Sequence, residues 1–328
     1  MAKKRTLTYL VTGAAGFIGA RFVESCNARK ISVISVDQEK LFGQRPEHRG
    51  FQFGTVVDLD QLPLWLSQPG HSIDAIVHLG AVTDTRETNL DLLRRLNVDY
   101  SQFLWNYATT KKIPMIYASS AATYGDGQQG YDDDEALIPQ LKPLNAYGDS
   151  KLQFDLWALE QEKFGKHPPS WAGFKFFNVY GFGERHKGFM SSVVLHAFEE
   201  IQKSGKVTLF KSHREGIPDG FQKRDFVWVD DVVEVLHFSL QKPIRRGIYN
   251  LGTGKARPFL HLAQAVFKAL GKPAQIEFIE TPVSIRDKYQ YFTEAKMDRL
   301  RAQGYSRPFA ELEKGVEEYV GRLGRGQA

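Results

Sequence analysis

The sequence places a tyrosine and a lysine four residues apart, Tyr147 and Lys151, downstream of a serine at Ser120. Residues four apart lie on one face of a helix, and Leu152 to Glu162 continue in a helical pattern. A free tyrosine has a pKa near ~10, but a neighbouring ammonium stabilises its phenolate. The Ser120 hydroxyl can steady a substrate oxygen. The three residues therefore predict proton exchange with an alcohol while hydride moves to or from a nicotinamide.

A glycine-rich segment, Gly13-Ala-Ala-Gly16-Phe-Ile-Gly19, lies between a strand-like stretch and a helix-like stretch. Gly13 suits a tight turn, Gly16 lets the backbone approach a pyrophosphate, and Gly19 permits close packing of the helix on the strand. The free N–H groups and partial positive charge of a helix N-terminus attract phosphate. We therefore expect a dinucleotide site rather than a plain structural turn.

The acidic residue at the end of the second strand-like stretch, Asp37, bears on the choice of cofactor. A carboxylate there can accept hydrogen bonds from the adenosine ribose, which favours NAD over NADP. Lys40 and Arg45 follow closely and could pair with a 2′-phosphate, or could simply face solvent in a loop. The sequence leaves these alternatives open. Asp58, after a strand-like stretch, is expected beside the adenine.

The elements that must position these residues alternate along the first two-thirds of the chain. Strand-like stretches cover 8–12, 31–36, 51–57, 75–79 and 114–118, and helical spacing covers 17–28 and other segments between them. This alternation is typical of a parallel sheet with helices on both faces. We therefore predict an α/β fold with a doubly wound parallel sheet of the Rossmann type.

Taken together, the glycine-rich segment, the strand-end serine and the Tyr147 and Lys151 pair resemble the extended short-chain dehydrogenase/reductase family. Further matching segments are Leu79-Gly-Ala-Val-Thr83, Asn97, Arg224-Asp-Phe-Val-Trp-Val-Asp-Asp-Val232 and Gly247-Ile-Tyr-Asn-Leu-Gly-Thr-Gly254. The resemblance implies one tightly bound cofactor per subunit. NADP is slightly favoured by the resemblance and NAD by Asp37. The residues implied around the cofactor are Gly13, Gly16, Phe17, Ile18, Gly19, Asp37, Gln38, Asp58, Leu79, Gly80, Ala81, Asn97, Tyr147, Lys151 and Val179.

The same resemblance implies two interleaved domains. Residues 1–178 plus about 228–256 would form the dinucleotide-binding Rossmann domain. Residues 179–227 plus about 257–328 would form a second, smaller α/β domain that binds the substrate. The family habit carries this division, since composition alone does not reveal it.

Within the family, the residues after Ser120 argue against a dehydratase. Sugar-nucleotide 4,6-dehydratases of the family usually have an acidic pair just after the active-site hydroxyl, because elimination of water needs an acid and a base. Here Ala121 and Ala122 follow Ser120, and neither can transfer a proton. The segment Phe176-Phe-Asn-Val-Tyr-Gly-Phe-Gly-Glu-Arg-His-Lys-Gly-Phe-Met-Ser-Ser192 resembles the ADP-glycero-manno-heptose 6-epimerases. Stretches 118–125, 142–147, 221–227 and 286–293 resemble them too. The resemblance implies transient oxidation at C6″ of an ADP-heptose, for lipopolysaccharide core synthesis. The same hydride then returns to the other face of the carbonyl.

Inversion by this route needs a proton donor or acceptor on each side of the carbon. By the resemblance, Tyr147 serves one side and Lys187 the other. Burial can lower the pKa of a lysine toward neutrality, which suits this role. The alternative for Lys187 is contact with phosphate or solvent.

The resemblance also implies a set of substrate-binding residues: Asn178, Lys187, His196, Phe210, Arg224 and Tyr289. His196 lies in an apolar stretch, where a purely structural histidine is an equal alternative. Arg224 is expected to reach the nucleotide phosphates, although an ion pair with Asp225 is an alternative. Phe189 and the long basic segment 210–220 depart from the family pattern near the expected pocket.

Two rival functions remain open. One is another nucleotide-sugar epimerase of the UDP-hexose 4-epimerase type, against which Lys187 and its flanks argue. The other is a non-catalytic cofactor-binding regulator or scaffold. Such proteins often lose the tyrosine or the lysine, whereas Ser120, Tyr147 and Lys151 are all present.

Composition narrows the partners. The net charge is +5 and the pI about 9.0, with lysines and arginines spread along the chain. This favours an anionic small molecule over nucleic acid. No apolar run approaches the ~20 residues of a membrane helix, and no signal peptide opens the chain, so we expect a cytoplasmic protein that does not bind membranes. We also expect a homo-oligomer.

No metal site is predicted. The single cysteine, Cys26, can form neither an intrachain disulfide nor a cysteine cluster, and we expect it to be buried and inert. The acidic run Tyr131-Asp-Asp-Asp-Glu135 is interpreted as a solvated loop rather than a metal site.

Overall fold

A seven-stranded parallel sheet forms the centre of the computed structural model, which describes residues 5–242, 244–286 and 289–325. The strand order is β10-β6-β5-β4-β1-β2-β3, and every neighbouring pair is parallel. The strands are β1 (Thr8–Thr12), β2 (Ser32–Asp37), β3 (Thr55–Asp58), β4 (Ala75–His78), β5 (Met115–Ser120), β6 (Trp171–Phe176) and β10 (Gly247–Leu251). The predicted doubly wound α/β fold is confirmed.

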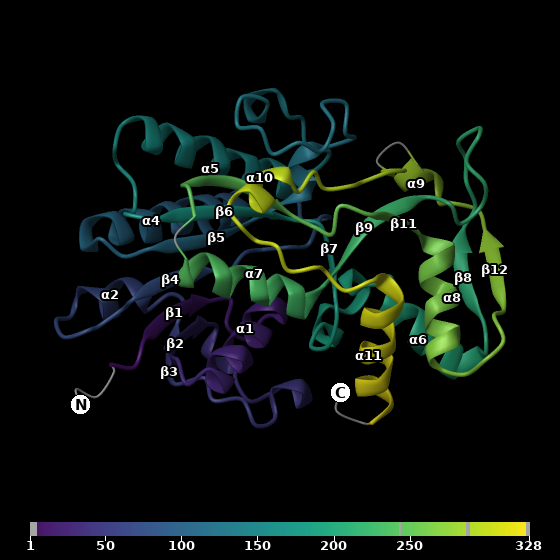
Figure 1. The fold of residues 1–328 in the computed structure, drawn as a ribbon, viewed down its shortest axis with the longest axis horizontal. Helices are drawn as coiled ribbons and strands as arrows, with labels where there is room; N and C mark the ends of the chain where they lie inside the picture. Colours follow the sequence, from purple (N-terminus) through teal and green to yellow (C-terminus); the bar gives the residue numbers. More distant parts are fainter. Residues whose placement is uncertain (1–4, 243, 287–288, 326–328) are drawn as a thin grey trace.

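Helices cover both faces of this sheet (Figure 1). On one face α1 (Phe17–Ala28) packs against α7 (Val229–Gln241). On the other face lie α4 (Tyr100–Lys111) and α5 (Ala146–Lys163). The π-helix η3 (Arg94–Asp99) leads directly into α4 and contacts α5. The shorter elements are α2 (Leu62–Ser67), α3 (Leu90–Leu93), α10 (Asp298–Ala302), η1 (Glu39–Leu41), η2 (Pro46–His48), η4 (Ala121–Tyr124) and η5 (Ile138–Gln140). Because both faces are covered, central strands such as β4 are buried along their whole length.

A second, smaller group of elements lies to the right in Figure 1. It contains a three-stranded sheet, β11-β9-β7, and a two-stranded sheet, β12-β8. Its elements are β7 (Asn178–Tyr180), η6 (Arg185–Met190), α6 (Val193–Ser204), β8 (Val207–Phe210), β9 (Lys223–Trp228), β11 (Ala256–Pro258), α8 (Phe259–Ala269), β12 (Ile276–Ile279), α9 (Val283–Arg286) and α11 (Leu312–Gly324).

Each group of elements has its own buried apolar cluster. The larger cluster fills both faces of the seven-stranded sheet, and the smaller one joins α6, α8 and α11 through side chains such as Val194, Leu262 and Val316. Leu300 and Tyr305 belong to the larger cluster. The chain therefore returns to the large sheet before it forms α11.

The interpretation of residues 131–135 as a solvated loop is wrong. Asp133 is 1% exposed and accepts the Asn250 backbone N–H at 2.7 Å, and Glu135 accepts the Ile248 N–H at 3.0 Å. Both backbone groups belong to β10, which is an edge strand and has unpaired N–H groups on its open side. The carboxylates satisfy these groups, and burial raises the pKa of Asp133 to about 6.

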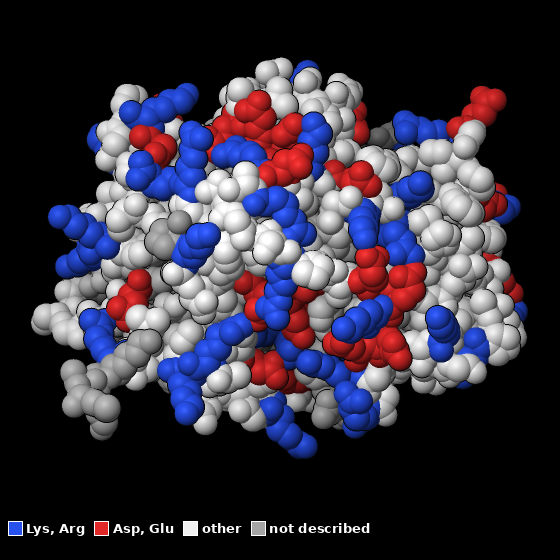
Figure 2. Space-filling model, in the orientation of Figure 1, with Lys and Arg blue, Asp and Glu red and all other residues white. Residues whose placement is uncertain are grey.

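The surface charges, the helices and the possible metal ligands can be compared with the expectations from composition. Lys and Arg side chains are interspersed with Asp and Glu over the face in Figure 2. No helix of the described ranges is long and apolar enough to cross a membrane. Over those same ranges, no three His, Cys, Asp or Glu side chains gather as a metal site requires. Cys26 is buried in α1, and burial raises the pKa of its thiol to about 12.

Candidate active site

A cavity of about 600 Å³ opens at the carboxyl ends of β1, β2, β4, β5 and β6. The strand order reverses direction between β1 and β4, and ligands of open parallel sheets bind at such a point. The predicted site residues that line the cavity are Gly13, Gly16, Phe17, Ile18, Gly19, Asp37, Gln38, Leu79, Gly80, Ala81, Ser120, Tyr147, Lys151, Asn178, Val179 and Lys187. The predicted site residues outside this lining are Asp58, Asn97, His196, Phe210, Arg224 and Tyr289.

Two glycines of the glycine-rich turn from β1 into α1, Gly13 and Gly19, have no room for a side chain. Gly13 has a φ of +65°, and a Cβ atom there would lie 2.6 Å from the Gly80 backbone nitrogen. A Cβ atom on Gly19 would overlap the Gly13 carbonyl oxygen. Gly16 directly precedes α1, whose first N–H groups have no partner within the helix. The turn therefore leaves a helix N-terminus open to a phosphate at the cavity wall.

Asp37, at the end of β2, faces the next part of the cavity. Its carboxylate accepts the Ala15 N–H at 3.1 Å and the Gln38 N–H at 2.9 Å, while burial raises its pKa. Arg45 also lines the cavity and donates to the Ala15 carbonyl. Lys40 is exposed in η1 and does not line the cavity. Of the two basic residues that the sequence leaves open, Arg45 alone is placed to meet a ligand.

Asp58 and Asn97 organise the backbone around the cavity. The Asp58 carboxylate accepts the Glu39 N–H at 3.0 Å. Asn97, on the π-helix η3, accepts the Val82 N–H at 2.8 Å and donates to the Ser150 hydroxyl at 2.9 Å. Asn97 thus joins the loop after β4 to the helix α5.

Ser120, Tyr147 and Lys151 meet at the cavity wall. Ser120 ends β5, and its hydroxyl accepts the Ala122 N–H at 3.1 Å. Asn145 caps α5 by accepting the Gly148 N–H at 2.8 Å, which sets Tyr147 and Lys151 on the first two turns. Burial raises the pKa of Tyr147, against which a hydrogen bond with Ser120 acts.

Burial also acts on the lysine of this group. It lowers the pKa of Lys151 to about 8, partly offset by the carboxylate of Asp155. Because burial raises the pKa of Tyr147 above its ordinary value, this side chain is a neutral phenol at neutral pH. A positive charge added to the cavity would favour its phenolate.

Lys187 reaches the same cavity from the second group of elements. It lies in η6, beside Gly188, whose φ of +52° breaks the helical turn. Burial lowers the pKa of Lys187, and the buried carboxylate of Glu184 acts in the opposite direction. Glu184 itself is held by the Ser192 hydroxyl and by the N–H groups of Ser192 and Gly181. The cavity therefore contains two proton-exchanging groups from separate elements, Tyr147 and Lys187.

Arg224 is not part of the cavity lining but lies next to Phe259, which is. Its guanidinium carbon is 5.5 Å from the Phe259 ring centre and 5.5 Å from that of Tyr289. Arg224 is 8% exposed, burial lowers its pKa, and within the described ranges no carboxylate pairs with it. Asp225 instead accepts backbone N–H groups, for example that of Thr253 at 2.7 Å. The alternative of an Arg224–Asp225 ion pair is therefore wrong.

Two more of the candidate substrate residues have defined surroundings. Phe210 packs edge-on against Tyr289, with ring centres 6.3 Å apart, and Tyr289 in turn lies next to Arg224. The His196 Nε2 atom is 3.3 Å from the carbonyl of Phe189, the residue that departs from the family pattern. The Phe189 side chain is 75% exposed.

Fifteen further residues line the cavity without having been predicted as site residues, although the sequence offered Arg45 for a 2′-phosphate and several others lie in segments that resemble the family. They are Leu41, Arg45, Thr83, Thr85, Ala118, Ser119, Phe176, Phe177, His186, Met190, Ser191, Ser192, Val193, Phe226 and Phe259. Many of them flank a predicted residue along the chain. Phe226 and Phe259 come from β9 and α8, and no spacing rule connects those elements to the cavity.

Comparisons with known proteins extend these observations. A family model described as the NAD dependent epimerase/dehydratase family matches residues 9–252. A curated relative from Fusobacterium nucleatum, named ADP-L-glycero-D-manno-heptose-6-epimerase, is 44% identical over 322 residues. That alignment covers 95% of this chain and 96% of the relative.

A relative of the same name from Nitratidesulfovibrio vulgaris is 42% identical over 318 residues, covering 95% of this chain and 96% of the relative. Among solved structures, the Helicobacter pylori ADP-L-glycero-D-manno-heptose-6-epimerase superposes with a TM-score of 0.79 at 26% identity. The match covers 97% of this chain and 96% of that one. Similarity thus extends over both groups of elements.

Proposed function

Because the chain belongs to the NAD dependent epimerase/dehydratase family, we propose that it interconverts ADP-D-glycero-D-manno-heptose and ADP-L-glycero-D-manno-heptose. Relatives of that activity, similar over nearly the full length, support this function. The observation in the structure that carries it is the meeting of Tyr147 and Lys187 in one cavity. The product would serve the synthesis of the lipopolysaccharide core.

The cavity fits a dinucleotide. Gly13, Gly16 and Gly19 bring bare backbone to the cavity wall, and α1 begins there with its free N–H groups. When bound, the nicotinamide supplies reversible hydride acceptance at C6″. The residues that would hold the dinucleotide are the lining residues already predicted for it, with Asp58 and Asn97 shaping the backbone around them.

Tyr147 is the acid–base group on the first side of the carbon. Its phenolic oxygen takes the proton of the C6″ hydroxyl as the carbonyl forms, and Ser120 holds the substrate oxygen. Lys151, one helical turn away, stabilises the phenolate while its ammonium is charged. Its position also suits a hydrogen bond to the nicotinamide ribose.

Lys187 is the acid–base group on the second side. Its lowered pKa makes a neutral amine accessible at a lower pH than for an ordinary lysine, so the side chain can accept as well as donate a proton. After the carbonyl has turned in the site, its oxygen faces the second acid–base group. If Tyr147 took the hydroxyl proton, Lys187 returns a proton to the oxygen, and in the reverse direction the two roles are exchanged. The configuration at C6″ is inverted in this way.

Arg224 supports an anionic substrate. A buried guanidinium beside two aromatic rings is suited to the diphosphate of an ADP-sugar. Tyr289 lies next to Arg224 and Phe210 next to Tyr289, and we propose that both rings pack against the nucleotide. Asn178 lines the cavity and would contact the sugar. We propose that His196, whose Nε2 atom is near the Phe189 carbonyl, also contacts the substrate.

We further propose that the cofactor site accepts both nicotinamide dinucleotides and binds NADP more tightly. Both Asp37 oxygens already accept backbone N–H groups, which leaves the carboxylate less free for a ribose. Arg45 lines the same part of the cavity and offers a cation to a 2′-phosphate. The resemblance to the family favours NADP as well.

Other features of this proposal rest on the family resemblance. We place the cofactor on residues 1–178 plus about 228–256, and the sugar on 179–227 plus about 257–328. The two separate apolar clusters support this division, although residues 295–305 pack on the first cluster. We also propose a homo-oligomer that works in the cytoplasm.

The test is to incubate the purified protein with ADP-D-glycero-D-manno-heptose and follow the C6″ configuration by proton NMR. We expect a mixture of the two epimers, and no mixture with Tyr147→Phe. UDP-glucose serves as the control for the rival 4-epimerase function and should remain unchanged. Bound cofactor without turnover of either sugar would favour a non-catalytic role.

A further inference from the structure

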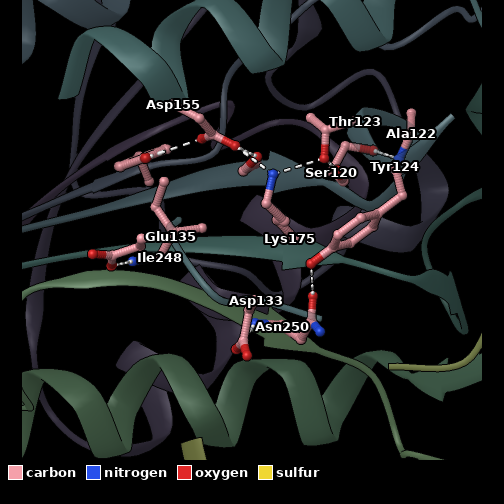
Figure 3. A network of polar contacts seen from close by, with 12 residues as sticks. Ser120, Ala122, Thr123, Tyr124, Asp133, Glu135, Asp155, Lys175, Ile248 and Asn250 are labelled. Carbon is pink, nitrogen blue, oxygen red and sulfur yellow. Dashed lines mark hydrogen bonds and ion pairs between the residues drawn. The ribbon is translucent and has the colours of Figure 1, made fainter. Parts of the chain in front are cut away.

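A fully buried ion pair lies beneath the candidate active site and has no part in the chemistry described so far. Asp155 of α5 and Lys175 of β6 are both 0% exposed, and the Lys175 Nζ atom is 2.7 Å from the Asp155 Oδ2 atom (Figure 3). Desolvating two charges is costly, and well-packed apolar side chains often serve stability as well or better. The pair therefore calls for an explanation beyond packing.

Hydrogen bonds connect the pair to the strand end that carries Ser120, and the Asp155 Oδ1 atom also accepts the Tyr117 hydroxyl of the same strand at 3.0 Å. The Lys175 Nζ atom lies 5.2 Å from the centre of the Tyr124 ring. The Ser119 hydroxyl donates to Asp155 at 2.7 Å, and Lys175 donates to the Thr123 hydroxyl at 2.7 Å. Thr123 in turn donates to the Ser120 carbonyl at 2.8 Å. Side chains alternate along a strand, so with Ser119 directed at Asp155, Ser120 is directed to the other side.

The helix face above the pair carries the other two residues of the candidate site. Tyr147, Lys151 and Asp155 are spaced by four residues on α5 and share one face. From Tyr147 to Asp155 the helix rises about 12 Å. The phenol of Tyr147, the ammonium of Lys151, the carboxylate of Asp155 and the ammonium of Lys175 therefore follow one another in this order.

We propose that Asp155 and Lys175 are a positioning pair for the reaction. The pair locks Ser120 and the Tyr147 face of α5 in one arrangement and presents balanced charge beneath them. This inference rests on the proposed function for the roles of Ser120 and Tyr147. The geometry of the pair itself does not depend on the substrate.

The electrostatic effect of the pair has a defined sign. The Asp155 carboxylate raises the pKa of both Tyr147 and Lys151, and Lys175 opposes it at close range. The other polar or titratable groups facing this region are Tyr117 and Ser119 of β5, Thr123 and Tyr124 of η4, and His78 of β4. Burial and the carboxylates of Asp133 and Asp155 raise the pKa of Tyr124, so that it is a neutral phenol. Burial lowers the pKa of His78 to about 3, so that it is neutral.

The test follows the ionisation of Tyr147 directly in the holoenzyme. Protein labelled with [ζ-¹³C]tyrosine is titrated by NMR, and Tyr147→Phe identifies the resonance. Asp155→Asn leaves the Lys175 ammonium without its counter-charge and should lower the midpoint of the Tyr147 titration. Coulomb's law at a separation of about 12 Å gives a shift of about one pH unit. Lys175→Met leaves a carboxylate that still accepts from Tyr117 and Ser119, and should raise the midpoint by a similar amount.

If the proposal holds, the two single variants shift the midpoint of the Tyr147 titration in opposite directions. The double variant Asp155→Asn/Lys175→Met should return the midpoint to within a few tenths of a pH unit, because it again carries no net charge. Shifts in the same direction, or none, would overturn the proposal and leave the pair a structural element only.

If a single variant does not fold, one further variant, Lys175→Arg, and the turnover of the double variant decide the matter. Lys175→Arg should keep the midpoint and retain turnover within about threefold. The double variant should lose about tenfold or more in kcat at unchanged KM, because Ser119 and Thr123 lose their partners. Full kcat in the double variant would overturn the proposal. Absence of heptose turnover in the unaltered protein would count against the proposed function alone, since the titration needs no substrate.

Discussion

The Nζ atom of Lys187 lies 5.5 Å from the centre of the Phe17 ring. Phe17 is the first residue of α1 and directly follows Gly16 of the glycine-rich turn. The turn η6, which belongs to the second group of elements, therefore lies against the segment that would hold the cofactor pyrophosphate. This contact brings the proposed second acid–base group to the dinucleotide end of the cavity.

Replacement of Lys187 should stop epimerisation. We expect Lys187→Met to lose at least about 100-fold in kcat, as is usual when a general acid or base is removed, and to keep its cofactor. Lys187→Arg should be equally inactive at every pH, because an arginine does not lose its proton. NMR of the C6″ proton measures both rates.

Arg185→Ala is the matched control for Lys187. Arg185 is exposed in the same turn and lies 3.7 Å from Glu199 at the surface. Its variant should keep nearly full kcat. If Lys187→Met kept a rate within a few-fold of the unaltered protein, the second base would have to be sought elsewhere.

Lys151 should lower the stability of the fold while it serves the site. Burial lowers its pKa from 10.5 to about 8, so that the unfolded chain holds this proton more tightly than the folded one. The penalty is largest below pH 8 and disappears as pH rises through 8 to 10.5. It amounts to ~3 kcal/mol at most, since a tenfold change in proton affinity corresponds to 1.36 kcal/mol.

Lys151→Met should therefore raise the free energy of unfolding at pH 7 and abolish turnover. Urea unfolding of both proteins between pH 7 and 10 measures the difference, which should shrink as pH rises. A variant less stable than the unaltered protein at pH 7 would show that the ammonium is better solvated than its burial indicates.

Arg224 should act on substrate affinity more than on the chemical step. Charge-assisted hydrogen bonds to a diphosphate are worth about 1.5–3 kcal/mol, so Arg224→Ala should raise KM by about 10- to 100-fold. Arg257 pairs with Arg224 in the β-sheet register but binds Glu313 at the surface, which makes Arg257→Ala the control. Equal KM values for the two variants would remove Arg224 from the substrate site.

Arg45 should distinguish the two cofactors. We expect Arg45→Ala to weaken NADP by about tenfold and NAD by much less, because only NADP has a 2′-phosphate for the guanidinium to meet. Calorimetric titration of stripped protein gives both affinities. A parallel loss for NAD and NADP would mean that Arg45 supports the turn through its bond to Ala15 rather than the phosphate.

Residues close to the strand ends could be predicted from the sequence. Gly13, Asp37, Leu79 and Ser120 each follow or end a buried strand, and parallel strands bring their carboxyl ends to one edge. The same rule predicts the doubly wound sheet itself. Motif spacing along the chain was sufficient in these cases.

Contacts between distant segments could not be predicted in this way. Asp133 looks like part of a solvated acidic loop, yet it satisfies an N–H group of the edge strand β10, 117 residues away. Lys175 has no local signal as a buried partner of Asp155, because only the packing of α5 on the sheet removes both side chains from water. Asn97 acts through a π-helix, which hydrophobic spacing does not indicate.

The most direct test of transient oxidation at C6″ is the fate of a label on that carbon. ADP-D-glycero-D-manno-heptose carrying deuterium at C6″ is converted in ordinary water, and the product is analysed by mass spectrometry and NMR. We predict that the L-glycero product retains its deuterium at C6″, because the hydride that leaves the carbon is the one that returns. Replacement of the deuterium by solvent hydrogen would contradict the account and point to inversion by deprotonation.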